Sequence, residues 1–242
     1  MAEPVCVNAR IEAVNPLGAG VREIRLHCIA APRFLPGQYL QIVHGTDSVI
    51  PFSIASAPDE LPHITLHYLA QAGADDAARM EDLLATESSV DVLLPCGDCG
   101  FANPLSRPLL MLAGGSGIAG VRSLLRTLLP APVAIRLYWG AVGAEDLYLR
   151  AELDEMASRY AEFNWTPVSE TAADDCRRGR VGEVVAEDVA AGTLDLSEWE
   201  VLIAGGPPMV WGSVEVLKHH GLKAERTRSD VFAYAPREDL WD

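Results

Sequence analysis

The first hundred residues alternate between apolar and polar positions with the period of two that is typical of β-strands. The clearest example is Ile24, Leu26 and Cys28, which alternate with polar and charged neighbours. Residues 38–44 and 64–69 are also rich in strand-forming side chains. Short strands separated by turns predict an antiparallel sandwich or barrel. Pro- and Gly-containing segments that predict turns separate the runs, at residues 15–18, 35–37 and 56–59.

One helix is expected to interrupt these strands, over residues 75–85. Asp75 or Asp76 could act as its N-cap, because a carboxylate accepts hydrogen bonds from the free N–H groups of a first helical turn. Apolar side chains recur near helical spacing in this segment, at Ala78, Met80, Leu83 and Leu84.

The pattern changes near residues 103–108. Residues 109–113 form an apolar run without alternation, as expected for a strand buried on both faces. Strand-like and helix-like segments then alternate, which predicts a doubly wound parallel sheet covered by helices. We therefore expect an antiparallel sandwich or barrel over residues 1–104 and an α/β domain over residues 105–242. The segments are strands at 133–139, 163–168 and 201–204, helices at 146–160, 181–189 and 208–220, and a helical stretch with Val121, Leu124, Leu125 and Leu128.

Composition and charge exclude several classes of function. The 242 residues are 49% hydrophobic and 22% charged, which is ordinary for a globular protein, and their formal net charge is -15 at pH 7. Nucleic acids and anionic membrane surfaces need a basic footprint that this chain does not provide. No apolar run reaches the roughly 18–20 residues of a membrane helix, and the N-terminus lacks the apolar segment of a secretory signal. The five cysteines, an odd number, favour a reduced, cytoplasmic protein.

No metal site is expected at the closely spaced pair Cys96 and Cys99. Their C-x-x-C spacing lacks the second cysteine pair or the histidine pair that would complete a zinc or iron–sulfur site. A thioredoxin-like site would place this motif at the start of a helix, whereas here it lies in a segment rich in Pro and Gly. A turn with two incidental thiols is the expected structure.

A glycine-rich segment follows the long apolar run and precedes a helical stretch. Gly115, Gly117 and Gly120 satisfy the G-x-G-x-x-G pattern in the strand–turn–helix context that dinucleotide binding requires. Glycines let the backbone approach a ligand closely, and the helix N-terminus attracts phosphate. The alternative is a tight turn that binds nothing. The acidic residues that could bind a ribose, Glu145 and Asp146, lie later than the roughly 20 positions usual for this motif.

A second glycine turn runs from Gly205 to Met209, after the predicted strand 201–204. It also leads into a helix, and Pro208 suits the first helical turn. Ligands of doubly wound sheets bind at the carboxyl ends of the strands, so the two glycine turns could line one crevice. On this ground alone, the sequence predicts that a nucleotide or dinucleotide binds.

Seven short motifs follow one another along the chain: Pro36-Gly37-Gln38-Tyr39, Pro51-Phe52-Ser53-Ile54-Ala55-Ser56, Gly114-Gly115-Ser116-Gly117, Tyr138-Trp139-Gly140, Asp146-Leu147-Tyr148, Gly179-Arg180-Val181-Gly182 and Ala204-Gly205-Gly206-Pro207-Pro208-Met209. Their order resembles the ferredoxin–NADP reductase superfamily, and most closely the small bacterial NAD(P)H–flavin reductases, which use flavin as a substrate. The resemblance spans roughly residues 5–235. In that family a flavin-binding antiparallel barrel precedes a nicotinamide-binding α/β domain, in agreement with the two halves of this chain.

The resemblance implies where each cofactor would bind. Ser53 would lie near flavin N5, at a strand edge beneath the isoalloxazine ring, and the implied catalytic residues are Ser53 and Ser116. The remaining flavin contacts would come from Pro51, Phe52, His67, Tyr68 and Leu69. The nucleotide turns and a C-terminal aromatic segment near the ring would contribute Gly114, Gly115, Ser116, Gly117, Trp139, Gly140, Ala204, Gly205, Gly206, Pro207, Met209, Phe232 and Tyr234.

The implied activity is that of an NAD(P)H:flavin oxidoreductase, in which a hydride passes from the nicotinamide to FMN, riboflavin or FAD. The two rings would meet face to face in a cleft that joins the barrel to its neighbour, and positioning would supply most of the rate. Other interpretations of single residues stay open. Ser53 could satisfy a strand-end amide, Phe52 could belong to the core, and His67 is expected to be an exposed strand residue rather than a catalytic acid.

Two departures from the family pattern bear on cofactor choice. Ile50 stands where the family has an arginine that pairs with flavin phosphate, and Asp75 and Asp76 begin the helix that elsewhere faces the flavin pyrophosphate. A weakly bound, exchangeable flavin is therefore expected. Val142 stands where an arginine often helps to bind the nucleotide, with Arg180 a partial substitute, so NADH is favoured over NADPH.

Three hypotheses about function follow. The first is a flavin reductase that passes reduced flavin or electrons to a partner such as an oxygenase. The second is an electron-transfer subunit that works only inside a multi-protein oxidoreductase or oxygenase. The third is a degenerate nucleotide-binding module, which the uncharged Ile50 and Val142 keep open.

Overall fold

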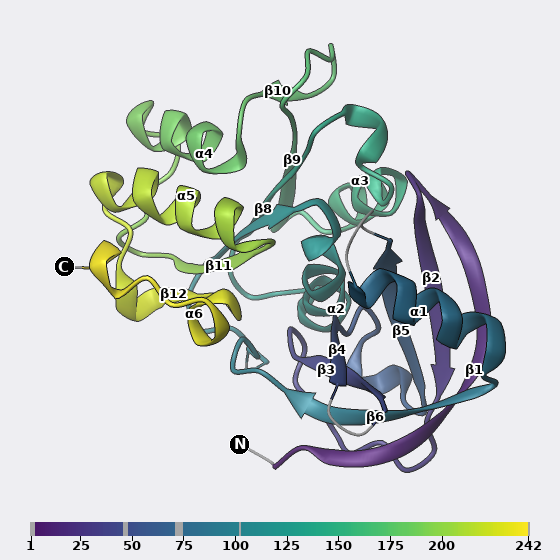
Figure 1. The fold of residues 1–242 in the computed structure, drawn as a ribbon. Helices are drawn as coiled ribbons and strands as arrows, with labels where there is room; N and C mark the ends of the chain where they lie inside the picture. The colour runs from purple at the N-terminus through teal and green to yellow at the C-terminus, as the bar shows by residue number, and fades with distance from the viewer. Residues whose placement is uncertain (1–2, 46–47, 71–74, 102, 242) are drawn as a thin grey trace. The chain divides into compact units, whose positions relative to one another are not determined.

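A computed structural model describes residues 3–45, 48–70, 75–101 and 103–241 (Figure 1). The chain divides into two compact units. The first contains the residues up to Phe101 together with Ala119–Thr127, and the second contains Ala102–Ile118 and the residues from Leu128 onwards. The segment that follows the glycine-rich motif therefore belongs to the first unit.

The first unit is an antiparallel barrel, which confirms the predicted fold of this half. Six described strands form one sheet in the order β4-β3-β6-β1-β2-β5. A bridge between Ile54 and Leu66 joins the two edge strands, so the sheet closes on itself. The strands are β1 (Val5–Gly18), β2 (Val21–His27), β3 (Tyr39–His44), β4 (Ser48–Ser53), β5 (His63–Leu69) and β6 (Ser89–Cys96).

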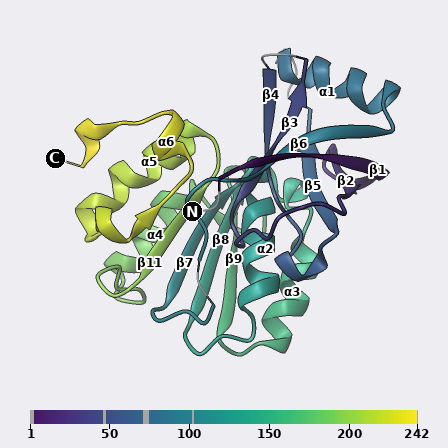
Figure 2. The ribbon, with the colours of Figure 1, turned by 90° about the horizontal axis from the view of Figure 1, so that it is seen from below.

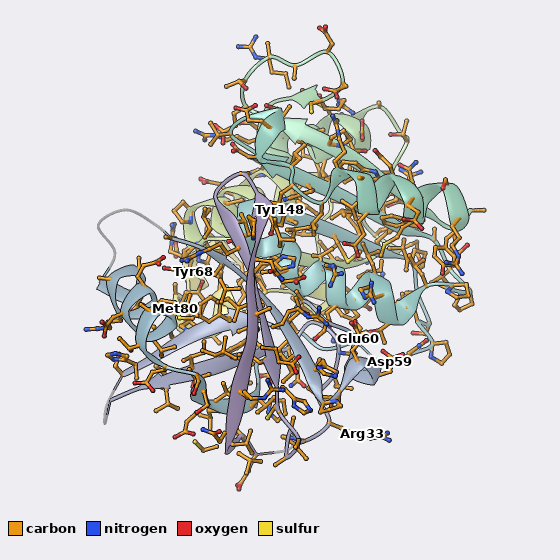
Figure 3. The ribbon with its side chains drawn as sticks, turned by 90° about the vertical axis from the view of Figure 1, so that its right-hand side faces the viewer. Arg33, Asp59, Glu60, Tyr68, Met80 and Tyr148 are labelled. Atoms are coloured by element: carbon orange, nitrogen blue, oxygen red, sulfur yellow. The ribbon has the colours of Figure 1, made fainter. Side chains whose placement is uncertain are left out.

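The alternating residues fill the barrel core as the sequence predicts. Ile24 and Leu26 of β2, and Cys28 directly after it, are completely buried. Helix α1 (Asp75–Thr86) confirms the predicted helix and adds Met80 (Figure 3) and Leu83 to the same core. Burial of side chains of this size contributes about 1.5–3 kcal/mol each.

Two details of this half differ from the prediction. Ala78 is exposed, because only one stripe of α1 faces the barrel. The turn expected at residues 15–18 is absent from the described chain, since β1 continues through this segment to Gly18. The chain reverses at Ala19 and Gly20, whose φ angles are 52° and 74°. Pro16 is tolerated in the strand because the register shifts between Pro16 and Gly18.

The second unit is a parallel sheet with helices on both faces, as predicted. Its order is β10-β9-β8-β7-β11-β12, and every described pair in it is parallel. Helices α4 and α5 cover one face and α3 lies on the other (Figure 2). The strand that begins at Leu109 lies inside the sheet and is buried on both sides, in agreement with its unbroken apolar sequence. The strands are β7 (Leu109–Gly114), β8 (Ile135–Ala141), β9 (Phe163–Ser169), β10 (Arg177–Arg178), β11 (Glu200–Ala204) and β12 (Thr227–Arg228).

The helices of this half lie near their predicted positions, with one clear shift. The helix expected from residue 146 begins at Arg150, because the Asp146 carboxylate accepts the Gly143 N–H at 3.0 Å and closes a separate short turn. No described helix has both the length and the apolar character needed to cross a membrane. The α-helices are α2 (Ile118–Leu128), α3 (Arg150–Arg159), α4 (Val181–Ala190), α5 (Pro207–Leu217) and α6 (Val231–Tyr234). Short 3₁₀ turns occupy Pro58–Glu60, Gly115–Gly117, Ala144–Asp146, Lys218–His220, Ala224–Arg226 and Glu238–Leu240.

Candidate functional site

The outer face of the barrel at β3 and β4 carries the first group of candidate residues. In the antiparallel register Tyr39 lies opposite Ser53, and Gln41 lies opposite Pro51. Because side chains alternate along a strand, these four share one face while their neighbours point into the core. Pro51 is exposed, and the other three are half-buried.

Strand β5 continues this face on the other side of β4. Extending the antiparallel Ile54–Leu66 bridge places Ser53 opposite His67 and Pro51 opposite Leu69. The outer face thus carries a polar row that contains Ser53 and His67. The row beside it contains Pro51 and Leu69 and has exposed apolar atoms, since Leu69 is 39% exposed. We call this surface the β4 platform. Its members are Tyr39, Gln41, Pro51, Ser53, His67 and Leu69.

Phe52 and Tyr68 lie on the inner side of the same strands, not on the platform. Both are buried in the barrel core, and their rings meet edge to face at 6.0 Å. The Arg22 guanidinium lies 4.9 Å from the centre of the Tyr68 ring, and the Tyr68 hydroxyl donates to the Ala77 carbonyl at 3.2 Å. Phe52 is therefore a core residue, which was the alternative interpretation of the sequence. Neither ring offers a free face for stacking.

His67 is buried, and the prediction that it would be exposed is wrong. It is 5% exposed. Burial, and then the nearby positive charge of Arg122, lower the pKa of His67 to about 3. The imidazole is therefore neutral across the physiological range, and it cannot act there as a proton donor with an imidazolium charge.

The buried state of His67 has a measurable consequence for stability. The folded-state pKa of about 3 lies below the ordinary 6.5, so below pH 6.5 the unfolded chain binds a proton that the folded chain does not. The free energy of unfolding should therefore fall as the pH drops from 6.5, by up to about 1.4 kcal/mol per pH unit from this group. Urea titrations between pH 6.5 and 4.5 should show a smaller decline in the variant His67→Gln. Equal slopes would contradict the buried neutral state.

Ser53 lies against the first turn of α2, within the first unit. A Cβ built on Gly120 would lie 3.6 Å from Ser53 Cβ and 3.7 Å from Ser53 Oγ. The third glycine of the G-x-G-x-x-G pattern thus brings helix backbone close to a strand, which is a packing role rather than a phosphate contact.

The glycine-rich loop of the second unit has the geometry that its sequence suggests. Gly115 has a φ of 51°, in the region that favours glycine. A Cβ on Gly117 would lie 2.3 Å from the Ala204 carbonyl oxygen, so only glycine allows the loop to approach the end of β11. Ser116, which lies between these two glycines in the sequence, is half-buried. The loop ends where α2 begins, and N–H groups at the start of a helix attract anions in general.

The second glycine turn meets the first through Met209. Cβ atoms on Gly114 and Gly205 would each lie 3.0 Å from this side chain, at Cγ and Sδ respectively. Gly206 is the N-cap of α5, and Pro207 occupies its first position, one residue earlier than expected. Parallel pairing of β7 and β11 brings the two turns together at one end of the sheet. This is the arrangement predicted for a nucleotide site.

Trp139 supports the loop from below instead of lining it. The indole is fully buried, and its Nε1 donates to the Gly115 carbonyl at 3.0 Å. Gly140 allows α4 to pack closely, because a Cβ there would lie 2.2 Å from Val181 Cγ2. We expect both residues to act on a ligand through the loop and the sheet, not by direct contact.

The two C-terminal aromatic residues, Phe232 and Tyr234, lie in different environments. Phe232 packs on Trp211 at 4.9 Å and on Trp241 at 5.7 Å between ring centres, so it belongs to a cluster of the second unit. Tyr234 is exposed and is the member available for a ligand.

The two departures from the family pattern occupy different environments. Ile50 is 6% exposed and lies in the barrel core opposite Ile42. Val142 is exposed, and its carbonyl accepts the Ser169 hydroxyl and the Thr171 N–H. Arg180 is an exposed residue at the N-cap of α4. Ile50 therefore provides no anchor for a phosphate.

The six platform residues include no Lys or Arg side chain that could pair with a phosphate. Pro51 and Leu69 offer apolar surface, and Ser53 offers a hydroxyl beside it. Within the described residues, no group of three or more His, Cys, Asp or Glu side chains could hold a metal ion. Cys96 and Cys99 are both buried, and burial raises the pKa of the Cys96 thiol.

Comparison with known proteins places this architecture. The profile of the oxidoreductase NAD-binding domain family matches residues 111–215. A cytochrome P450 reductase from Amycolatopsis has a similar structure, with a TM-score of 0.84 at 26% identity over 95% of this chain and 71% of that one. The fold is that of the ferredoxin–NADP reductase superfamily.

Proteins of similar sequence identify the family within this superfamily. An NAD(P)H-flavin reductase from Vibrio harveyi is 32% identical over 94% of this chain and 99% of its own length. The reductase component of a propane 2-monooxygenase from Gordonia sp. (strain TY-5) is 27% identical over 93% of this chain and 67% of its own length. The chain belongs to the NAD(P)H–flavin reductase family.

Platform residues Tyr39 and Gln41 were absent from the predicted site, as was the buried helix residue Ser123, which donates to the Ser56 carbonyl. Tyr39 stands in the quoted motif Pro36-Gly37-Gln38-Tyr39, so a signal existed. Ser123 carried none, because its position depends on how α2 packs in the first unit.

Proposed function

We propose that this chain catalyses the reduction of an exchangeable flavin by NADH or NADPH. The observation that carries the proposal is the β4 platform, whose exposed Pro51 and Leu69 lie beside the Ser53 hydroxyl on the barrel. The paired glycine turns of the second unit support a nucleotide site, and the 32% identity to a flavin reductase supports the reaction. When bound, the flavin supplies the redox chemistry by accepting two electrons from the nicotinamide.

The residues of the chain bind the flavin and the nicotinamide nucleotide and orient them. Pro51 and Leu69 would provide the apolar surface for the ring, and the Ser53 hydroxyl would offer it a hydrogen bond. The N–H groups from Gly115 to Gly117 would hold the nucleotide phosphates, and Ser116 would supply a hydroxyl to the same ligand. His67 is neutral and shapes the polar row without donating a proton. Positioning of this kind supplies most of the rate in reactions between two bound rings.

The preferred ligands follow from charge. Because Ile50 lies in the core, no cation projects from its position, and riboflavin and FMN should bind weakly and exchange. The uncharged, exposed Val142 favours NADH over NADPH, whose 2′-phosphate would need a cation. The odd number of cysteines, five, suits a cytoplasmic enzyme.

Turnover measurements test the proposal directly. Purified protein mixed with NADH and excess riboflavin or FMN should lose nicotinamide absorbance at a rate proportional to enzyme concentration. Absence of turnover with nucleotide still bound would contradict the reductase and leave a binding module.

Ser53→Ala provides the matched mutational test. Loss of the hydroxyl should lower kcat/KM for riboflavin about tenfold, because one hydrogen bond to the ring is lost. The KM for NADH should change less than twofold. Ser48→Ala is the control, since Ser48 lies on the same strand but donates nothing to the platform and instead accepts from Arg79 at 3.2 Å. Equal effects of the two substitutions would remove Ser53 from the site.

A second candidate function is an electron-transfer subunit. The relative from Gordonia is named as a reductase component of a monooxygenase, and it shares most of this chain's length. Under this alternative the flavin would stay bound and electrons would pass to an oxygenase partner. Turnover that requires addition of such a partner would favour it.

A further inference from the structure

We propose that Ser123 of α2 is a positioning residue, which fixes the Ser53 hydroxyl in the orientation that receives the flavin ring. This inference rests on the proposed function, because that function assigns the ring contact to Ser53. It concerns a buried helix residue that never reaches the β4 platform itself.

The backbone beyond Ser53 leaves the sheet almost at once. The Ile54 N–H donates to the Gln38 carbonyl at 3.2 Å, and the Ala55 N–H donates to the Thr65 carbonyl at 2.8 Å. The carbonyls of Ala55 and Ser56 accept instead from side chains of α2. Two buried acceptors next to the candidate ring contact therefore depend on one helix.

Consecutive residues of α2 supply these donors. Arg122 Nη1 donates to the Ala55 carbonyl at 3.0 Å, and Ser123 Oγ donates to the Ser56 carbonyl at 2.7 Å. Ser123 is 0% exposed, and Ser56 is also buried, with its hydroxyl accepting the Thr65 N–H at 3.1 Å. Water has no access to the Ser56 carbonyl, so loss of the Ser123 donor would leave that acceptor unpaired.

A third contact lies one helical turn further on. Arg126 Nε donates to Glu60 Oε1 at 3.0 Å, and the same oxygen accepts the Ala57 N–H at 2.7 Å (Glu60 is labelled in Figure 3). Both side chains of this ion pair are partly exposed, so its contribution is small. The buried, neutral bond of Ser123 is the stronger determinant of how the helix sits on the segment.

The position of α2 then determines the surroundings of the Ser53 side chain. The backbone of α2 at Gly120 lies against the Ser53 side chain, where a Cβ would be 3.6 Å from Ser53 Cβ and 3.7 Å from Oγ. A small rotation or slide of α2 would change the space left for the Ser53 hydroxyl. Ser123 lies one helical turn after Gly120. Its hydrogen bond to Ser56 therefore fixes the distance between the Gly120 backbone and the Ser53 side chain.

A double-mutant cycle on riboflavin binding tests this inference without turnover. Riboflavin is titrated against protein in the absence of NADH, with quenching of flavin fluorescence as the readout. Ser123→Ala should weaken binding about tenfold, the effect of one buried hydrogen bond, whereas Ser123→Thr should retain affinity. In the Ser53→Ala background, Ser123→Ala should change the Kd less than twofold, because the hydroxyl it positions is gone.

The control is Thr127→Val, which removes a hydroxyl on the same helix that donates to the Ser123 carbonyl at 2.8 Å. It should leave riboflavin affinity within twofold, and all variants should bind NADH equally. If Ser123→Ala folds poorly, Ser123→Cys replaces it, with a weaker donor of similar shape. Additive effects in the cycle, or unchanged affinity in Ser123→Ala, would overturn the inference. Unchanged affinity in Ser53→Ala would overturn the ring contact of the proposed function as well.

Discussion

Replacement of Gly117 by alanine is expected to slow NADH-dependent flavin reduction at least about 100-fold while the barrel still binds riboflavin. A Cβ at this position would lie 2.3 Å from the Ala204 carbonyl oxygen and 2.6 Å from its carbon. Both atoms are backbone, so no side chain can rotate away, and the loop or the end of β11 must move. A displacement of about 1 Å at a ligand site can cost about 100-fold in rate. We expect kcat/KM for NADH to fall by at least about that factor in initial-rate measurements, with a higher KM, and NADH to bind more weakly in calorimetric titration.

Gly212→Ala is the matched control for this substitution. Gly212 lies within α5, and a Cβ there would meet nothing within 4 Å. Alanine should raise the free energy of unfolding by about 0.5–1 kcal/mol, because it restricts the unfolded chain and favours the helix. NADH kinetics should not change. If Gly117→Ala also keeps the native KM for NADH, the glycine loop is not the nucleotide site.

The fold was predictable where one local signal determined each element. The alternation at Ile24 and Leu26 identified a strand with one buried face, and the unbroken run at residues 109–113 identified a strand buried on both faces. The start of α3 was not predictable from periodicity. There the Asp146 side chain bonds to a backbone N–H and forms a turn in place of the first helical residues.

The candidate site was predictable only in part, because its arrangement depends on strand register and on distant packing. The sequence drew attention to Ser53, but the platform emerges only when β3 and β5 are paired with β4, which adds Tyr39 and Gln41. His67 looked like an exposed strand residue. It is buried, and the charge that helps to keep it neutral comes from Arg122, which is 55 positions away in the chain.

Ile50→Arg restores the residue type of the family pattern, yet it is expected to unfold the barrel and not to strengthen phosphate binding. The Ile50 side chain is 6% exposed and lies among Ile42, Phe52 and other core residues. A guanidinium there would be a buried charge without a partner, which costs about 3–5 kcal/mol, a large part of the stability of an ordinary domain. The structure has therefore adapted to the apolar residue, and reversing one position does not recreate a phosphate site.

Val49→Arg separates this effect from phosphate binding itself. Val49 is the adjacent residue of β4, is 42% exposed, and lies on the outer side of the strand with Pro51. An arginine there should cost less than about 0.5 kcal/mol in stability, as surface substitutions usually do. It should also tighten FMN binding relative to riboflavin, because a guanidinium pairs well with phosphate. Urea denaturation of both variants and flavin titrations of Val49→Arg measure these effects. A stable Ile50→Arg protein that prefers FMN would instead show that position 50 can reach the ligand, and that its burial does not prevent a phosphate contact.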